Sequence, residues 1–389
     1  MRICLVGPCS PIDIMAYLSD FNKENFKDVK FYRGIPVSSL AIALLNENHE
    51  VEIISTAMEL AMEEVTFHGE RLKFTIVPGS SRAKNRALTL FWNDRRRLRK
   101  IIRKTQADIF HAHWTYEFAL ATMECKKNVL VTAHDAPVEI LRHYRDPYRL
   151  MRLILSILVR LRCQNLSAVS PYLASKWNNQ MFWRKEISIT PNLVPVDFAN
   201  KKPNNTKRSK VILCVADGFE LKNVKTLIYA WKLICSKISG YTLVLAGPGL
   251  GDNELRAWAV SKNLDFCIDW KGYLSRSEIL SLMENATLLC HPSLEESHCL
   301  AVLEAMYCEL PIVAGEKSGA IPWSVGNAAL LVDVTSARDI AEAIMKLIEF
   351  PELRAHLSNL GLIQIQNNFS NDNILIKYLE CYNKLINKK

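Results

Sequence analysis

Strand-like and helix-like segments alternate along the whole chain, and few folds are compatible with such a pattern. Short apolar runs such as ICLVG, VEIIST and NVLVTAH in the first half, and VILCVA and YTLVLAG in the second, are separated by segments with helical periodicity. This alternation is typical of βαβ units that build a parallel sheet. The sequence therefore predicts an α/β protein with a doubly wound sheet in each half.

A polar segment separates the two halves. Residues 200–210 (NKKPNNTKRSK) contain no apolar side chain, which is typical of a linker. A chain of 389 residues is long enough for two domains, and we expect them at residues 1–200 and 201–389. Residues 371–389 are predicted to form one amphipathic helix, which either completes the second domain or packs back on the first. Ligands of open parallel sheets bind beyond the carboxyl ends of the strands, so site residues are expected in the loops there.

Positive charge is concentrated in the first half. The formal net charge is +9, and residues 1–200 hold 28 Lys and Arg against 20 Asp and Glu. Residues 95–104 contain seven basic residues and no acid, and residues 141–162 contain six arginines at helix-like spacing among apolar residues. Two interpretations stay open: a basic amphipathic surface that faces an anionic membrane or another polyanion, or ordinary solvated helix faces.

The cysteines and the apolar segments bear on the cellular compartment. The eleven cysteines include no C-x-x-C pair, so neither a disulfide framework nor a zinc cage is indicated, and most are expected to be core residues in a reducing compartment. The N-terminal MRICLVG is too short for the apolar region of a signal peptide, and no stretch reaches 18 apolar residues. We expect a cytoplasmic protein that does not span a membrane, with peripheral attachment to its inner face as an option.

The segment at residues 287–319 (TLLCHPSLEESHCLAVLEAMYCELPIVAGEKSG) carries the most specific pattern. A strand is expected to end near His291. Glu296 lies in the loop before the next predicted helix and Glu304 about one turn inside that helix, with seven residues between them. Free backbone N–H groups at a helix start attract anions, so a diphosphate or a polar sugar is expected there. The residues at this start are His298, Cys299 and Leu300.

Two interpretations apply to the acids of this segment. Acids near a helix start can simply stabilise the helix dipole, and this is the reading that we favour for Glu295. Glu304, in contrast, lies on a largely apolar helix, where an unpaired carboxylate is costly and a ligand is a natural partner. A carboxylate can accept two hydrogen bonds from the vicinal diol of a ribose, and this contact needs no metal.

This segment resembles the Glu-x7-Glu motif of retaining glycosyltransferase family 4. The resemblance implies a GT-B fold, in which two Rossmann-like domains face each other across a cleft. It also implies that Glu296 contacts hydroxyls of the donor sugar and that Glu304 holds the nucleotide ribose. Two positions depart from the family pattern. Residues 297–299 (Ser-His-Cys) replace the usual Gly-Phe-Gly, and Trp323 stands where an acid is often found.

Lys222 lies after the strand VILCVA and just before a predicted helix. Taken alone it would be a solvated surface lysine. The segment VADGFELKN, however, resembles the phosphate-binding Arg/Lys loop of the family, in which a fixed cation stabilises charge on the leaving phosphate. The usual arginine about five residues earlier is missing, and Asp217 and Gly218 stand in that region.

Glycines mark a further loop of the second half. Gly247 and Gly249 in LVLAGPGLG match a turn of the family near the nucleotide. They do not form a dinucleotide fingerprint, because the third glycine is not at the required spacing, and this argues against an oxidoreductase.

Three residues of the first half are candidate ligand contacts. Gly34 precedes a predicted helix and allows close approach of a phosphate or sugar. His134 and Asp135 follow the strand NVLVTA and resemble the family's histidine that faces the donor sugar. We expect His134 to donate a hydrogen bond to the sugar or on the leaving-group side, with Asp135 supporting it or facing the acceptor. The alternative is that such histidines are structural, as is common.

The leading hypothesis is a glycosyltransferase of the hexosyltransferase type, active in polysaccharide or glycolipid biosynthesis. It would move a sugar from a nucleotide-diphosphate sugar to a hydroxyl acceptor, and the resemblance implies retention of the anomeric configuration. The chain has no D-x-D pair, so no metal cofactor is expected. The expected partners are the donor, a carbohydrate or lipid-linked acceptor and an anionic membrane surface, without nucleic acid. The alternatives are a nucleotide-sugar epimerase of the same fold and a non-catalytic membrane- or polyanion-binding protein on a transferase scaffold.

Overall fold

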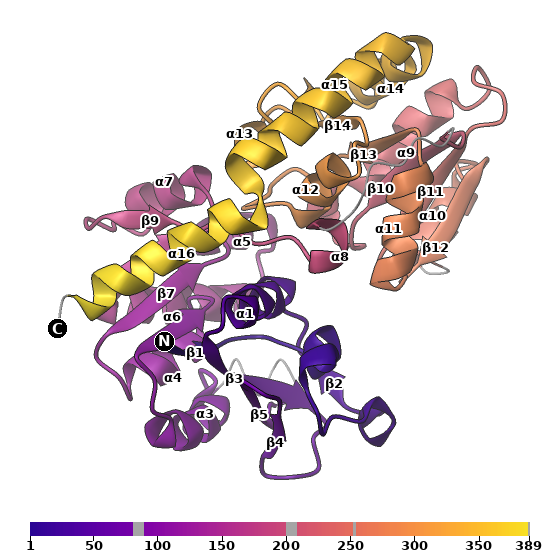
Figure 1. Cartoon of the computed structure of the whole chain (residues 1–389). Coiled ribbons are helices and arrows are strands. Elements are labelled where there is room, and N and C mark those ends of the chain that lie inside the picture. Colours follow the sequence, from indigo (N-terminus) through magenta and orange to yellow (C-terminus); the bar gives the residue numbers. More distant parts are fainter. Residues whose placement is uncertain (81–88, 200–207, 252–253, 388–389) are drawn as a thin grey trace. The chain divides into compact units, whose positions relative to one another are not determined.

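The computed structural model of the protein describes residues 1–80, 89–199, 208–251 and 254–387 (Figure 1). The chain divides into two compact units. Unit 1 consists of Met1–Leu193 and Asn371–Lys389, and unit 2 consists of Val194–Ser370. The domain boundary expected at residues 200 and 201 lies outside the described residues, as does most of the expected linker.

Unit 1 is built on one mixed sheet with the strand order β4-β5-β3-β1-β6-β7-β8-β9. Its strands are β1 (Arg2–Val6), β2 (Lys30–Phe31), β3 (Glu50–Met58), β4 (Val65–His68), β5 (Leu72–Pro78), β6 (Ile109–His113), β7 (Val129–Ala133), β8 (Asn165–Ala168) and β9 (Ile187–Ile189). The apolar runs ICLVG, VEIIST and NVLVTAH contribute β1, β3 and β7 to the parallel part of this sheet. The strands β2, β4 and β9 have only two to four residues, too few for a recognisable alternation.

Helices follow most strands of unit 1. They are α1 (Ile35–Asn46), α3 (Trp92–Lys104), α4 (Glu117–Met123), α5 (Pro137–His143), α6 (Pro147–Arg162), α7 (Pro171–Gln180) and α16 (Asn371–Ile386), with 3-10 turns at Pro11–Tyr17 and Lys23–Phe26. Local sequence explains several starts. Asp146 caps α6 by accepting a hydrogen bond from the backbone N–H of Arg149, Ser170 caps α7 in the same way, and a proline opens each of these helices.

The C-terminal helix α16 packs on the sheet of unit 1, against β6 and β7. Its tyrosines are fully buried there. The hydroxyl of Tyr382 lies 2.8 Å from Nδ1 of His111 on β6, and the hydroxyl of Tyr378 donates to the backbone oxygen of Thr190. Buried hydroxyl groups need such partners, so these two contacts fix where α16 lies on the sheet.

Unit 2 is built on a parallel sheet of six described strands in the order β12-β11-β10-β13-β14-β15 (Figure 1). The strands are β10 (Val211–Val215), β11 (Thr242–Ala246), β12 (Ile268–Gly272), β13 (Leu288–His291), β14 (Ile312–Gly315) and β15 (Ala329–Val332). Numbered from β10, this order is 3-2-1-4-5-6, that of a dinucleotide-binding sheet. The predicted α/β class with doubly wound sheets is confirmed.

Helices alternate with the strands of unit 2. They are α8 (Val196–Ala199), α9 (Val224–Ile234), α10 (Glu254–Ser261), α11 (Arg276–Asn285), α12 (Leu300–Tyr307), α13 (Ile321–Val325), α14 (Ala337–Glu349) and α15 (Pro351–Gln364), with a 3-10 turn at Glu220–Lys222 and a π-helical turn at Ile365–Phe369. In the part of the chain that the structure describes, no helix combines the length and apolarity that crossing a membrane requires.

The contact between Tyr382 and His111 yields a stability prediction. In a Tyr382→Phe variant the Nδ1 atom of buried His111 loses its partner, which is expected to lower the free energy of unfolding by about 1–3 kcal/mol. Urea denaturation followed by circular dichroism measures this change. The control is Tyr17→Phe, because Tyr17 donates to Asn46 at the exposed surface of the same unit and its loss should cost no more than about 0.5 kcal/mol. If both substitutions lowered the free energy of unfolding equally, the hydrogen bond between Tyr382 and His111 would not have the stabilising role predicted for it.

Candidate active site

The strand order of unit 2 reverses between β10 and β13, and the candidate residues lie in the loops that follow these two strands. Lys222 and Asn223 follow β10, whereas Glu296 follows β13. The side-chain amide of Asn223 donates to the backbone oxygens of Pro292, at 3.2 Å, and of Val334, at 2.7 Å, and so ties its own loop to the loops that follow β13 and β15. Asn223 has a left-handed backbone conformation, which asparagine tolerates better than most residues.

Lys222 and Glu296 form a largely buried ion pair. The ammonium of Lys222 donates to Oε1 of Glu296 at 2.7 Å, and Nε2 of His291 lies 2.8 Å from the same oxygen. Burial alone would raise the pKa of Glu296, but the charge of Lys222 and the hydrogen bond from His291 outweigh it and hold that pKa well below its ordinary value. Burial would likewise lower the pKa of Lys222, but Glu296 raises it. Both groups therefore stay charged near neutral pH.

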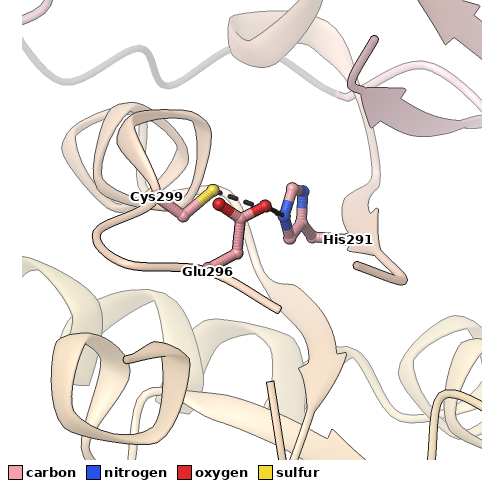
Figure 2. Close-up of side chains that lie close together, drawn as sticks. All are labelled: His291, Glu296 and Cys299. Atoms are coloured by element: carbon pink, nitrogen blue, oxygen red, sulfur yellow. Dashed lines mark hydrogen bonds and ion pairs between the residues drawn. The ribbon is translucent and has the colours of Figure 1, made fainter. Parts of the chain in front are cut away.

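Cys299 completes a cluster with His291 and Glu296, drawn in Figure 2. Its Sγ atom lies 3.4 Å from Nε2 of His291, and the three donor atoms lie within 4.8 Å of one another, so by donor type they could hold a metal ion. Two observations favour hydrogen bonding instead. The ammonium of Lys222 already supplies the counter-charge of Glu296. Burial lowers the pKa of His291, but the neighbouring Cys299 and Glu296 outweigh it and raise that pKa to about 10, so the ring is protonated near neutral pH and has no lone pair for a metal ion.

The expected helix start at Cys299 is close to the observed one. Cys299 is the N-cap of α12, which begins at Leu300. His298 does not point into an open site. Its ring packs against the rings of Trp323 and Phe369, with centroids 5.8 and 5.9 Å apart. The two departures from the family pattern, His298 and Trp323, thus contact each other within one aromatic cluster.

Glu304 is buried on α12 without an ion pair or a side-chain hydrogen bond among the described residues. Burial raises its pKa to about 7, and the charge of Arg276 offsets this only in part. A carboxyl group in such a position is ready to accept hydrogen bonds from a ligand, because each bond to the charged form lowers the pKa again.

Contacts within the chain itself explain the glycines at positions 34 and 247. Gly247 has a φ of +136°, and a Cβ atom there would lie 1.8 Å from the backbone oxygen of Ala216. A Cβ atom on Gly34 would lie 1.7 Å from the backbone oxygen of Pro8. At both positions, therefore, glycine is required because the backbone passes close to another backbone segment of the same chain. Gly249 also has a positive φ and lines a pocket of about 940 Å³ together with Asn223.

The candidates of unit 1 lie at the ends of neighbouring strands. His134 directly follows β7, is half-buried, and has its Nε2 atom 3.0 Å from Nδ1 of His113 at the end of β6. Burial lowers the pKa of His134 to about 3, so the ring is neutral at pH 7. Asp135 accepts a hydrogen bond from the Tyr116 hydroxyl at 2.7 Å and pairs with Arg152 at 3.7 Å, which fixes its carboxylate within the unit.

The sequence did not single out His291 and Asn223 as site residues. A histidine at a strand end and an asparagine at a helix start are both common in structural roles. The available signal was their position, because His291 ends β13 and Asn223 follows β10, and the strand order reverses between these two strands. That signal required the strand order, which one-dimensional periodicity does not provide.

The raised pKa of Glu304 gives a pH-dependent prediction. The folded protein holds this proton more tightly than the unfolded chain, so the free energy of unfolding falls as the pH rises from 4.5 to about 7. The full difference is about 3 kcal/mol. In Glu304→Gln this contribution disappears. Urea denaturation at pH 5 and pH 7.5 should therefore show a smaller fall in the free energy of unfolding between the two pH values than in the wild type. Glu349→Gln, an exposed change on α14 of the same unit, is the control and should keep the wild-type loss.

Two family models match adjacent parts of the chain. The model "Glycosyltransferase Family 4" matches residues 37–198, and the model "Glycosyl transferases group 1" matches residues 196–361. Among curated protein sequences, an uncharacterized glycosyltransferase of Haemophilus influenzae is 26% identical over 54% of this chain. The match spans 59% of that relative's length.

Solved structures show the same fold over the full chain. Sucrose-phosphate synthase from Thermosynechococcus elongatus superposes with a TM-score of 0.75 at 16% identity and covers 100% of both chains. Anabaena HepE, solved in complex with UDP and glucose, superposes with a TM-score of 0.70 at 16% identity over 98% of both chains. The chain therefore belongs to the group 1 and family 4 glycosyltransferases and has their GT-B fold.

Proposed function

We propose that the protein transfers a hexose from a nucleotide-diphosphate sugar to a hydroxyl acceptor with retention of the anomeric configuration, and that it needs no metal ion. The observation that supports this most is the buried pair of Lys222 and Glu296 at the point of unit 2 where the strand order reverses. In sheets of this kind that point binds nucleotides. The fixed cation of such a pair can bind a phosphate, and the carboxylate can accept a hydrogen bond from a sugar hydroxyl.

The reaction breaks the bond between the anomeric carbon and the diphosphate oxygen, and negative charge grows on the leaving phosphate. Lys222 stabilises this charge, as preorganised cations do, and its pairing with Glu296 keeps it protonated throughout. Glu296 keeps its hydrogen bond from His291 and accepts from hydroxyls of the sugar. In the retaining course the acceptor hydroxyl attacks from the face that the phosphate leaves, and the phosphate takes its proton. This course is inferred from the family.

Glu304 would bind the ribose of the nucleotide. Two ribose hydroxyls can donate to one carboxylate, and these bonds favour its ionised form. Because the unliganded group has a pKa of about 7, ribose binding would release part of a proton to the buffer near neutral pH. His134 of unit 1 would donate a hydrogen bond to the donor sugar.

Substitution of Lys222 tests the proposed reaction. Lys222→Ala removes the cation at the leaving phosphate, and kcat/KM for transfer from the preferred sugar nucleotide should fall at least about 100-fold. A panel of nucleotide-diphosphate sugars in a thermal-shift assay first identifies that donor, because a ligand that binds only the folded state stabilises it. Lys232→Ala, a change of an exposed lysine on α9, is the control and should leave kcat/KM unchanged.

The double variant Lys222→Ala,Glu296→Gln guards against misfolding, since it removes both charges of the pair at once. If neither variant changes turnover, the proposed role of the pair is wrong. Conversion of the sugar nucleotide to an isomer without any acceptor would favour the alternative of an epimerase. Binding of anionic surfaces without binding of any nucleotide would favour the non-catalytic alternative.

The helix α6 suggests an anionic membrane surface as a partner of unit 1. Leu150, Ile154, Ile157 and Leu161 form one stripe of this helix and are 42–63% exposed. The exposed side chain of Arg162 lies at the C-terminal end of this stripe, and the exposed Arg142 belongs to the preceding helix α5. An apolar stripe flanked by arginines is typical of helices that lie in the interface of an anionic bilayer. This supports a lipid-linked acceptor and glycolipid or polysaccharide biosynthesis.

The basic helix α3 contributes less to such a surface than its sequence indicated. Arg95 and Arg99 point into the unit, where both pair with Glu124, and Arg99 does so at 2.8 Å. The side chains of Arg97 and Lys100 are about half exposed. For residues 95–104 the inward arginines are therefore structural, and the solvated-face interpretation applies to only part of the helix.

Substitution of apolar residues of the stripe by charged residues tests the proposed membrane contact. Ile154→Glu,Ile157→Glu should weaken sedimentation with vesicles of phosphatidylglycerol and phosphatidylcholine at least about tenfold, because each isoleucine contributes about 1.5–3 kcal/mol when fully buried. The matched control is Leu233→Glu, an equally exposed site on α9 of unit 2. Absence of wild-type sedimentation at low ionic strength would rule the contact out.

A further inference from the structure

The strand order of unit 1 also reverses, between β1 and β6, and His113 lies at that point. It is the last residue of β6, and its ring is fully buried. A Cβ atom on Gly7, the residue after β1, would lie only 2.9 Å from the Cβ atom of His113. Glycine at this position therefore leaves the room that the His113 side chain occupies.

His113 contacts His134 through ring nitrogens. Nδ1 of His113 and Nε2 of His134 lie 3.0 Å apart, which is a hydrogen-bond distance. Burial lowers the pKa of His134 to about 3 and that of His113 well below its ordinary value, so both rings are neutral at pH 7. A neutral imidazole carries one N–H group, and one of the two facing nitrogens must donate while the other accepts.

The surroundings of His113 distinguish the two possible arrangements. If Nε2 of His134 donated, the proton of His113 would have to lie on its own Nε2. That atom is buried and has no partner among the described residues, so the arrangement would leave a buried donor unsatisfied. If Nδ1 of His113 donates, its Nε2 is a bare acceptor, and unpaired buried acceptors are tolerated better than unpaired donors.

We propose that His113 is a positioning residue that donates from Nδ1 to Nε2 of His134 and thereby fixes His134 as the tautomer with its proton on Nδ1. His134 then has a single donor, at Nδ1, and no described residue forms a hydrogen bond with that atom. The inference deepens the proposed function and rests on it, because His113 can position His134 for the donor sugar only if His134 contacts that sugar. The tautomer itself does not depend on that contact.

A fixed tautomer has a consequence for recognition. With Nε2 engaged as an acceptor, the ring of His134 offers only its Nδ1–H group to a ligand. This group can donate a hydrogen bond to an oxygen atom of the ligand. The buried ring of His111 supports the pair from the other side, because its centroid lies 4.1 Å from that of His113. Its own nitrogens are engaged by hydroxyls of Tyr382 and Thr132, so His111 does not compete for His134.

Proton-coupled ¹⁵N spectra of histidine-labelled protein test the tautomer directly. Two-bond ¹H–¹⁵N correlations show which nitrogen of each ring carries the proton, and a His134→Ala variant assigns the His134 signals. We expect the proton of His134 on Nδ1 in the wild type and in His113→Asn, because the asparagine amide can donate from nearly the same position as the ring Nδ1. In His113→Phe we expect at least part of the population to move to Nε2–H. A wild-type His134 protonated on Nε2, or no change in His113→Phe, overturns the proposal.

Kinetics separate positioning from mere structural support. His113→Phe should lower kcat about tenfold with little change in the KM for the donor, and His113→Asn should restore most of it. In a His134→Ala background, His113→Phe should cause no further loss, since His113 acts through His134. A further tenfold loss in that background overturns the proposal. If the protein transfers no sugar at all, the proposed function fails, and the ¹⁵N spectra still decide the role of His113.

Discussion

The buried pair of Lys222 and Glu296 is the interaction on which the site of unit 2 depends. Removing one partner of such a pair leaves an uncompensated charge and typically costs about 3–5 kcal/mol. The pair therefore joins the loops after β10 and β13 and keeps both groups ionised, as the lowered pKa of Glu296 indicates. His291 holds the same carboxylate oxygen, and the side-chain amide of Asn223 ties its loop to the loop after β13 through the backbone oxygen of Pro292. The arrangement is set before any ligand binds.

The two units use the same topology for different chemistry. In each sheet the strand order reverses beside the first strand, and the loops there bring together residues that are far apart in sequence. In unit 2 this yields a charged pair, suited to a phosphate and a sugar hydroxyl. In unit 1 it yields neutral histidines in a buried network that extends to α16. At the point where the strand order reverses, unit 2 thus holds a charged pair and unit 1 holds uncharged rings.

His298 and Trp323, two residues that depart from the family pattern, lie in one aromatic cluster. His298 replaces the usual phenylalanine and still packs as a flat ring, against Trp323 and Phe369. Trp323, which replaces an acid, supplies one of the rings that it needs. Read singly, each departure put the site in doubt. Read together, they belong to one aromatic cluster beside the start of α12.

The sequence by itself determined the α/β class, most strands and helices, and the spacing of Glu296 and Glu304, because periodicity and motif spacing are local properties. Only the tertiary structure decided the strand order, the placement of α16, and the partners of each candidate. Lys222 and Glu296 are 74 residues apart, and His111 and Tyr382 are 271 apart. Local patterns carry no information on such pairs, since chain folding alone brings them into contact. The same holds for Gly34, whose close neighbour is Pro8 of the chain itself.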